Sequence, residues 1–430
     1  MNQAVLDLLS LEVNKYKVES VEEVKEKGQV IKLIRIKCIS KKHRCPKCNR
    51  FTTSVHDTLK PINLKHTEVF EYRSKISLIK RRFICHRCNK IFTEPTNLNQ
   101  KGCSVSNGVK RKIRKQLLNY NLSMKYIADE NNVSDVEVRN ELKIMMKDYP
   151  EFPNSLPRVI SFDEFKADTN YGKYAFIMND PIHKKTLDVL PSRKKDYLIN
   201  YFTKVSNRQS VEYVISDMYE PYLIVTKVMF PKAKYVVDRF HYVTYIMDAL
   251  DDIRIRLQDE YGIGSKEYKL LKNKKNVSLL RIYFNDVDDW YTYTKRYKNG
   301  HMVNIIKIDI LDEMLDLNNE LKRGYQLKEL FLDIVNHATY KSVEVELESF
   351  IELCIESKIP EFIEASKTIK NWLPYIVNSF IDKRFSNGYT EGLNNKIKVI
   401  KRVGFGYKNF TFFRLRLMYI LNGKIIGKNK

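Results

Sequence analysis

Two short apolar runs, each ending in an aspartate, decide the fold of this chain: Val214-Ile215-Ser216-Asp217 and Tyr235-Val236-Val237-Asp238-Arg239-Phe240-His241. An amphipathic segment separates them, so the pattern predicts strand, helix, strand. In an open α/β sheet, functional side chains collect beyond the carboxyl ends of the strands. Asp217 and Asp238 are therefore both candidate metal ligands, and the two runs alone leave the choice open.

Three further β-type runs precede this stretch, at residues 158–163, 173–178 and 186–190. The first ends in Asp163, and a helix-like segment at 196–205 follows the third. Three strands, helix, strand, helix, strand is the order of an RNase H-like mixed sheet. In that order, strands one and four are neighbours at the sheet centre, which favours Asp217 over Asp238 as the partner of Asp163.

A third acid leads a polar and basic segment at residues 386–402. Glycine and asparagine mark its start, and Leu393, Ile397 and Ile400 then recur at helical spacing. The opposite face carries one acid, Glu391, followed by polar and basic residues, whereas a solvated helix would intersperse several acids. That face and its flank comprise Asn394, Asn395, Lys396, Lys398, Lys401 and Arg402.

Three carboxylates in one domain suit a two-metal site for displacement at phosphorus. Oxygen ligands are those that Mg²⁺ prefers, with Mn²⁺ as an alternative ion. Between residues 242 and 381 the pattern is almost entirely helical, and this is far longer than an ordinary connection. We expect a helical insertion there.

Two Cys-x-x-Cys pairs, Cys45 with Cys48 and Cys85 with Cys88, predict a zinc ribbon. Four thiolates close a tetrahedral zinc site, which makes the expected role structural. Buried free cysteines or a redox pair are the alternatives. Because four thiolates saturate the ion, we expect the nearby histidines at the surface or facing DNA: His43, His56, His66 and His86.

Helical periodicity begins again at Val109, Ile113 and Leu117. A second short helix is expected after Ser123, and the run Ser134-Asp135-Val136-Glu137 reads as a capping box that opens a third. Three bases, Arg139, Lys143 and Lys147, share one face of that helix. The arrangement fits a helix-turn-helix whose last helix enters a major groove, although three short helices are also common in folds that bind nothing.

The 430 residues carry 76 Lys and Arg against 52 Asp and Glu, a net charge of +24. Such an excess favours nucleic acid as partner over mere solubility. No apolar run has the length of a membrane helix, and the N-terminus lacks the features of a signal peptide. We therefore expect a cytoplasmic protein with no membrane partner.

These motifs together resemble the DDE transposases of bacterial insertion sequences, specifically the ISL3 group. The most specific matches are Asp163-Glu164-Phe165, Ser216-Asp217, Asp238-Arg239-Phe240-His241 and the segment from Ser386 to Tyr407. The resemblance implies a catalytic triad of Asp163, Asp217 and Glu391. It makes Asp238 and His241 supporting residues, and Asn395 and Lys398 are expected to join them.

The expected architecture is a zinc-ribbon domain at 1–100, a helix-turn-helix domain at 108–149, and an RNase H-like α/β catalytic domain at 157–425. A proline-marked linker at 149–157 separates the last two. Lys401 and Arg402 are expected to contact DNA.

The predicted function is that of a transposase. It would bind the terminal inverted repeats of its element, cut double-stranded DNA with Mg²⁺, and join the ends to target DNA as a homo-oligomer. The alternatives are a DNA-binding regulator and a nuclease without strand transfer.

Overall fold

The computed structural model describes residues 2–9, 11–26, 28–69, 72–286, 290, 293–298, 300–404 and 409–426. The chain forms two compact units, one of Met1–Tyr149 with Lys396–Lys430 and the other of Pro150–Asn395. The boundary at Tyr149 falls in the segment that proline marks in the sequence. Among the helices described, none combines the length and the apolar character needed to cross a membrane.

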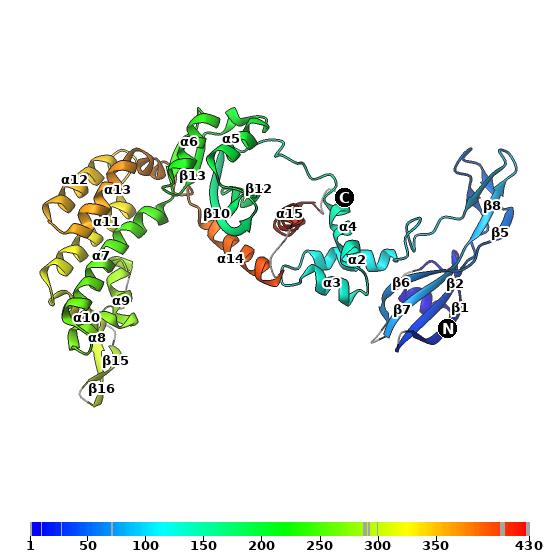
Figure 1. Ribbon diagram of the computed structural model, residues 1–430, viewed down its shortest axis with the longest axis horizontal. Helices are drawn as coiled ribbons and strands as arrows, with labels where there is room; N and C mark the ends of the chain where they lie inside the picture. The colour runs from blue at the N-terminus through cyan, green and yellow to red at the C-terminus, as the bar shows by residue number, and fades with distance from the viewer. Residues whose placement is uncertain are drawn as a thin grey trace. The chain divides into compact units, whose positions relative to one another are not determined.

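The unit of residues 150–395 is built on a five-stranded mixed sheet with the order β12-β11-β10-β13-β14. Strand β10 pairs antiparallel with β11 and parallel with β13. Apolar side chains of β10 and β11, among them Phe162 and Phe176, pack against Phe202 of α5 and Tyr222 of α6. Figure 1 shows the two helices together beside the sheet. These elements are β10 (Val159–Thr169), β11 (Gly172–Asp180), β12 (Lys185–Leu190), α5 (Lys195–Thr203), β13 (Tyr213–Ser216), α6 (Glu220–Met229) and β14 (Lys234–Val237).

A helical subdomain follows β14 and shares one continuous apolar core with the sheet. Its helices are α7 (Arg239–Tyr261), α8 (Lys266–Lys272), α9 (Lys274–Arg281), α10 (Lys307–Leu315), α11 (Asn319–His337), α12 (Val343–Glu356) and α13 (Pro360–Val377). The sequence pattern of this part is almost entirely helical, and the prediction of helix is wrong between α9 and α10. There the chain forms an antiparallel hairpin of β15 (Tyr293–Lys298) and β16 (His301–Ile306).

The N-terminal unit contains a four-stranded sheet with the order β1-β2-β7-β6. Helix α1 (Asn2–Leu8) contributes Leu6 to its core, beside Ile34, Ile36 and Ile76. Its strands are β1 (Tyr16–Glu26), β2 (Gln29–Cys38), β6 (Ile62–Val69) and β7 (Tyr72–Ile79). The cysteine knuckles belong to two smaller sheets, β3 (His43–Arg44) with β4 (Phe51–Thr52), and β5 (Val55–Thr58) with β8 (Arg81–Cys85) and β9 (Lys90–Thr93).

Three short helices complete the N-terminal part: α2 (Asn107–Leu117), α3 (Met124–Glu130) and α4 (Asp135–Met145). Serine caps each of them, because Ser106, Ser123 and Ser134 accept a hydrogen bond from a backbone N–H in the first turn. The last helix, α15 (Phe410–Ile426), packs against α2 and α4. Its buried Arg416 donates to the carbonyl oxygens of Asn119 and Leu122, in the turn between α2 and α3.

Candidate active site and metal centre

Three aspartates stand at one level on three adjacent parallel strands. The register pairs Ser161 with Ile215 on β13, and Ser216 with Val237 on β14. Continuing both registers brings Asp163, Asp217 and Asp238 into one row. Two hydrogen bonds at this level fix the alignment: Ser216 Oγ to the carbonyl of Phe162 at 3.1 Å, and the Asp238 N–H to the carbonyl of Ser216 at 2.8 Å.

The sequence predicts that Asp163 ends its strand, and this prediction is wrong. Strand β10 continues to Thr169, paired beyond Ser161 only with β11. Strand β13 stops at Ser216, so the sheet narrows at the level of Asp163 and leaves one edge of β10 open. A polar side chain at this position of β10 can contact a ligand although its residue lies inside a regular strand.

Alternation along β10 sends Asp163 and Glu164 to opposite faces of the sheet. Glu164 lies on the α5 and α6 face, where it forms an ion pair with Arg193 and accepts a hydrogen bond from the Tyr222 hydroxyl at 3.0 Å. Asp163 lies on the other face, which Ile215, Val236 and Phe385 make apolar. Glu164 has no predicted role, although its position directly after Asp163 in the sequence is a signal that could have identified it.

Helix α14 (Gly388–Val403) begins over the aspartate row. The Asn387 N–H donates to Asp238 Oδ1 at 3.2 Å, and the Asn387 side-chain amide donates to the Phe162 carbonyl at 3.3 Å. Thr390 then bonds Asn387 Oδ1 at 2.8 Å, and Asn394 Nδ2 donates to Asp163 Oδ2 at 3.0 Å. The first turns of the helix are thereby held to both β10 and Asp238.

Glu391 is in these first turns, three residues before Asn394. Its side chain lies outside the described residues. Asn395, which the sequence analysis selected, is exposed, whereas its neighbour Asn394 contacts Asp163. Adjacent residues of a helix point in directions about 100° apart, and the sequence pattern does not distinguish which of two neighbouring asparagines faces the strand.

Burial raises the pKa of all three aspartates in the row. For Asp163, the charges of Glu164 and Asp217 add to burial and bring the pKa to about 7. Burial also raises the pKa of Asp217 and of Asp238, while the His241 imidazole beside both opposes the rise. A divalent cation would relieve this repulsion, and carboxylate oxygens are the donors that Mg²⁺ prefers.

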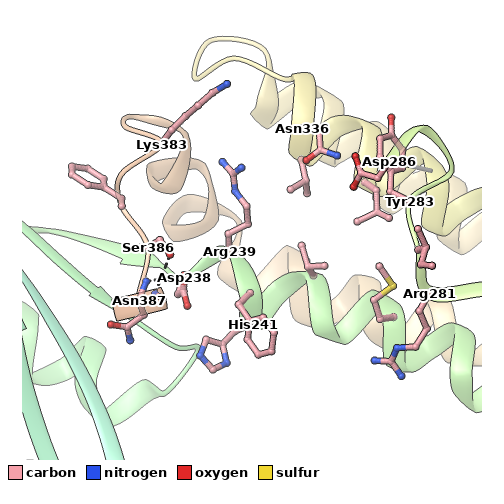
Figure 2. Close-up of a pocket in the computed structure, with 18 of the residues that line it drawn as sticks. Asp238, Arg239, His241, Arg281, Tyr283, Asp286, Asn336, Lys383, Ser386 and Asn387 are labelled. Atoms are coloured by element: carbon pink, nitrogen blue, oxygen red, sulfur yellow. Dashed lines mark hydrogen bonds between the residues drawn. The ribbon is translucent and has the colours of Figure 1, made fainter. Parts of the chain in front are cut away.

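A cavity of about 880 Å³ opens at this row, between the sheet and the helical subdomain. Asp163, Asp238 and Asn394 line it from the sheet side, and Tyr283 and Asn336 from the subdomain. Figure 2 shows Asp238, His241 and Asn387 on one side of this space, facing Tyr283, Asp286 and Asn336 across it. Asp217 is not among its lining residues.

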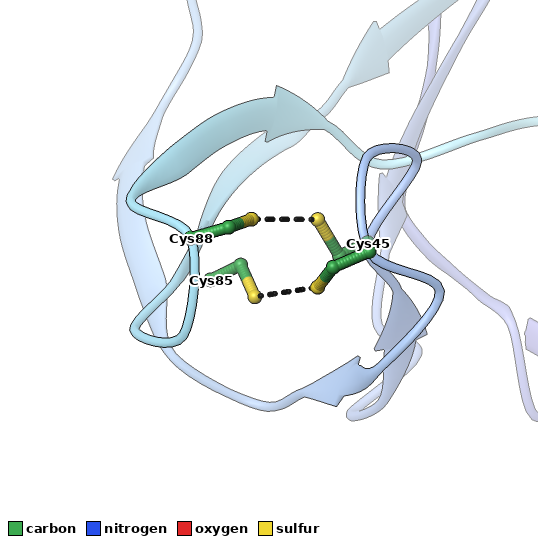
Figure 3. A group of neighbouring side chains, drawn as sticks. Cys45, Cys85 and Cys88 are labelled. Atoms are coloured by element: carbon green, nitrogen blue, oxygen red, sulfur yellow. Dashed lines mark hydrogen bonds between the residues drawn. The ribbon is translucent and has the colours of Figure 1, made fainter.

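The four knuckle cysteines converge in the N-terminal unit. Their Sγ atoms all lie within 4.8 Å of one another, with Cys45 and Cys88 3.5 Å apart and Cys48 and Cys85 also 3.5 Å apart (Figure 3). Tetrahedral zinc with Zn–S bonds of about 2.3 Å needs thiolates roughly 3.8 Å apart, so the donor set fits the ion. Within the described part of the chain, no other His, Cys, Asp or Glu group converges this closely in threes or more.

Backbone amides favour the thiolate form at this centre. Burial alone would raise the pKa of Cys45, but N–H groups of Cys48 and Lys47 lower it to about 6. The N–H of Arg87 likewise lowers the pKa of Cys85. Thiolates are the form that binds zinc.

Two of the four histidines near the knuckles are not surface residues, contrary to the expectation. The His43 ring packs on Phe83, with centroids 4.6 Å apart, and its Nε2 lies 3.3 Å from a buried Glu94 oxygen. His66 Nδ1 lies 2.8 Å from Ser106 Oγ, the cap of α2. Both are used in packing, whereas His56 and His86 are exposed.

The bases selected for DNA contact lie on the surface of the three-helix part and of α14. Lys143 and Lys147 are exposed, and Arg139 is half-buried. Arg139 and Lys143 lie over the Phe412 ring of α15, at 5.9 and 5.2 Å from its centroid. On α14, Lys398 and Arg402 are exposed and Lys401 is half-buried.

Residues 160–417, more than half of the chain, match the family model described as transposase, of the ISL3 type of DDE transposases. The chain belongs to this family. Residues 41–88 match the zinc finger of the transposases of IS204, IS1001, IS1096 and IS1165. The chain is an ISL3-type transposase with a zinc-finger module whose four cysteines support a structural zinc ion.

Two relatives differ in how much they share with this chain. The transposase for insertion sequence element IS1001 of Bordetella parapertussis is 22% identical over 406 residues, 94% of each chain. A protein named ATP-dependent protease, from Lactococcus lactis subsp. lactis, is 35% identical over 125 residues, 29% of this chain and 38% of its own. The similarity to the first relative extends over both compact units, whereas the similarity to the second covers 29% of this chain.

Proposed function

We propose that this ISL3-type transposase binds the terminal inverted repeats of its own insertion sequence, cuts the DNA at the element ends, and transfers the ends to target DNA. Asp163, Asp217 and Glu391 are the proposed catalytic carboxylates. The observation that carries the proposal is the row formed by the buried Asp238 and the half-buried Asp163 and Asp217, with the beginning of α14 held over it.

The sheet order supports an RNase H-like fold, because the strand of Asp163 lies between a hairpin strand and the parallel strand of Asp217. When bound, two Mg²⁺ ions would activate the attacking oxygen and stabilise the leaving one. Asn394 orients the Asp163 carboxylate, and Asn387 fixes Asp238. His241 places its imidazole beside Asp217 and Asp238, where phosphate would approach.

DNA recognition is assigned to the N-terminal unit. The zinc ribbon and the α2 to α4 helices, proposed as a helix-turn-helix with α4 in the major groove, would contact the inverted repeat. The exposed Lys143 of α4, Lys147 just beyond it and the exposed bases of α14 support this role, as does the net charge of +24. Because an element has two ends, we expect a homo-oligomer in the DNA complex.

Single substitutions at the row test the chemistry. In Asp163→Asn and Asp217→Asn, we expect the rate of Mg²⁺-dependent cleavage of a duplex carrying the element end to fall at least about 100-fold. Even residues that only hydrogen-bond to a metal ligand lower activity by about 10- to 100-fold when they are replaced. Binding of the same duplex should stay close to wild type. Asp196→Asn, an exposed acid on α5, is the matched control.

Efficient cutting by either variant would remove that residue from the catalytic set. The same assay with a supercoiled target plasmid separates transposase from nuclease. A transposase yields element ends covalently joined to the plasmid, whereas a nuclease only releases them.

A further inference from the structure

The cavity beside the aspartate row holds an aromatic side chain that packing does not explain. Phe240, in the first turn of α7, lines the cavity and is 62% exposed. Its neighbours on the same helix, Tyr242 and Ile246, are fully buried. The ring lines the cavity two residues from Asp238, so its apolar face is open to a ligand bound there.

The walls combine apolar, cationic and hydrogen-bonding groups. Val243, Met247 and Leu332 provide apolar surface, and Arg239, Arg281 and Lys383 provide positive charge. A site that only follows a DNA backbone needs charge but little apolar surface. The mixture suits a nucleotide, whose base has an apolar face and polar edges and whose phosphate is an anion.

Size limits the occupant to a small part of the DNA. A volume of about 880 Å³ falls within the roughly 300–1,000 Å³ typical of pockets that enclose one small ligand. A B-form duplex, whose major groove alone is about 12 Å wide, does not fit. A base can therefore enter only after it leaves the helical stack.

The wall opposite Phe240 is fixed in place by hydrogen bonds to α11. The Tyr283 hydroxyl donates to Asp333 at 2.9 Å, and the Phe284 N–H donates to Glu329 at 3.1 Å. The buried Lys328 ammonium donates to the carbonyl of Ile282 at 2.9 Å. These bonds hold the segment 282–286 in its present shape, so the cavity is formed before any ligand arrives.

We propose that this cavity receives one unpaired nucleotide of the DNA strand next to the scissile phosphate, and that the Phe240 ring stacks on its base. The inference rests on the proposed function, because it takes the aspartate row as the place of phosphoryl transfer. It adds a strand-opening step at the element end that the proposed cleavage and joining do not themselves require.

Fluorescence of 2-aminopurine tests the unstacking. The probe is a duplex carrying the terminal inverted repeat that flanks the gene, with 2-aminopurine at single positions on either side of the repeat boundary. With the full chain and Ca²⁺ in place of Mg²⁺, we expect fluorescence to rise at one of these positions. Phe240→Ala should abolish the rise, whereas Tyr245→Ala, a 45% exposed aromatic of α7 outside the cavity, should retain it.

Cleavage in Mg²⁺ gives a second readout. Phe240→Ala should cut the fully paired duplex roughly 5- to 100-fold more slowly, the range that one base–aromatic stack provides. A duplex whose base at the responsive position is already unpaired should restore much of that loss, because unpairing then costs little. A variant that merely failed to fold would not be rescued by the substrate.

The outcomes separate the two proposals. If the wild type cuts the ends but no position brightens and Phe240→Ala cuts normally, the nucleotide site is wrong and the transposase function stands. If the wild type neither cuts nor binds the ends, both proposals fail. Brightening that depends on Phe240 supports the site.

Discussion

Asn394 links the helix α14 to the carboxylate of Asp163 through one uncharged amide. A second carboxylate here would add to the repulsion that already raises the pKa of Asp163 to about 7. A lysine would compete with a metal ion for the carboxylate. An amide donor orients the oxygen without either effect, which gives a physical reason for asparagine at this position.

Asn394→Ala should therefore slow cleavage of element ends by roughly 10- to 100-fold, as for other groups that orient a metal ligand. End binding should be little changed, and a higher Mg²⁺ concentration should recover part of the rate. Measurement of cleavage against Mg²⁺ concentration, with Asn395→Ala in parallel, compares the two asparagines directly. A larger loss in Asn395→Ala would favour the sequence-based choice over the observed contact.

His66 gives the N-terminal unit a defined pH response. Burial, with the charge of Arg111, lowers the pKa of His66 to about 4. In the unfolded chain a histidine takes up its proton near pH 6.5. Between these values the unfolded state binds more protons, so stability falls as the pH falls.

We expect the free energy of unfolding of the N-terminal unit to drop by at most about 1.4 kcal/mol per pH unit from this residue between pH 6.5 and 4. Urea titrations of the full chain across this range, followed by hydrogen exchange of residues 107–117, measure it. His66→Gln should flatten the dependence, and His86→Gln, an exposed histidine, should not. An unchanged slope in His66→Gln would rule out His66 as the source.

At the scale of elements, local patterns predicted most of what the structure contains. Strands β13 and β14 follow the apolar runs at 214–216 and 235–237, and helices α2 to α4 begin after the serines that cap them. The apolar runs and the serine caps are signals of a few neighbouring residues, so a single sequence is enough to predict these elements. The aspartate row, by contrast, depends on a register between strands 54 and 21 residues apart.

The missed elements have distinct causes. The hairpin β15–β16 brackets Asn299-Gly300, a strong turn signal that the surrounding helical periodicity obscured. Helix α15 carries apolar residues around its whole circumference, and no such pattern tells which helices will cover it. Its attachment to the three-helix part rests on Arg416, whose partners Asn119 and Leu122 are almost 300 residues away.

The zinc ribbon should depend on its metal for its fold. Two- and three-stranded sheets of two to five residues bury little apolar surface, and zinc supplies roughly 10–16 kcal/mol in comparable modules. We expect one zinc ion per chain by metal analysis, and its loss with unfolding of residues 41–93 in Cys45→Ser. Cys103→Ser, outside the cluster, is the control. Retention of stoichiometric zinc in Cys45→Ser would contradict the four-cysteine site.

At the scale of the whole molecule, charge should dominate DNA affinity. Each phosphate neutralised on duplex DNA contributes a slope of about −0.9 in log affinity against log salt. Replacing Lys147, an exposed base at the end of the three-helix part, by alanine should make the slope less steep by about 1. Lys341, an exposed base of the helical subdomain, is a control. Equal slopes for Lys147→Ala and wild type would place Lys147 off the DNA.

Helix α14 begins in one compact unit and ends in the other, since Asn395 is the last residue of the unit proposed to be catalytic and Lys396 begins the second segment of the unit proposed to bind DNA. The two segments of this second unit are thus separated in the sequence by the whole of residues 150–395. Exchange of residues 1–149 between related elements would separate α2 and α4 from the α15 that packs on them. With end recognition assigned to this unit, as proposed, a new end specificity would have to be inherited as two segments together, which would restrict how such transposases recombine and how they can be retargeted.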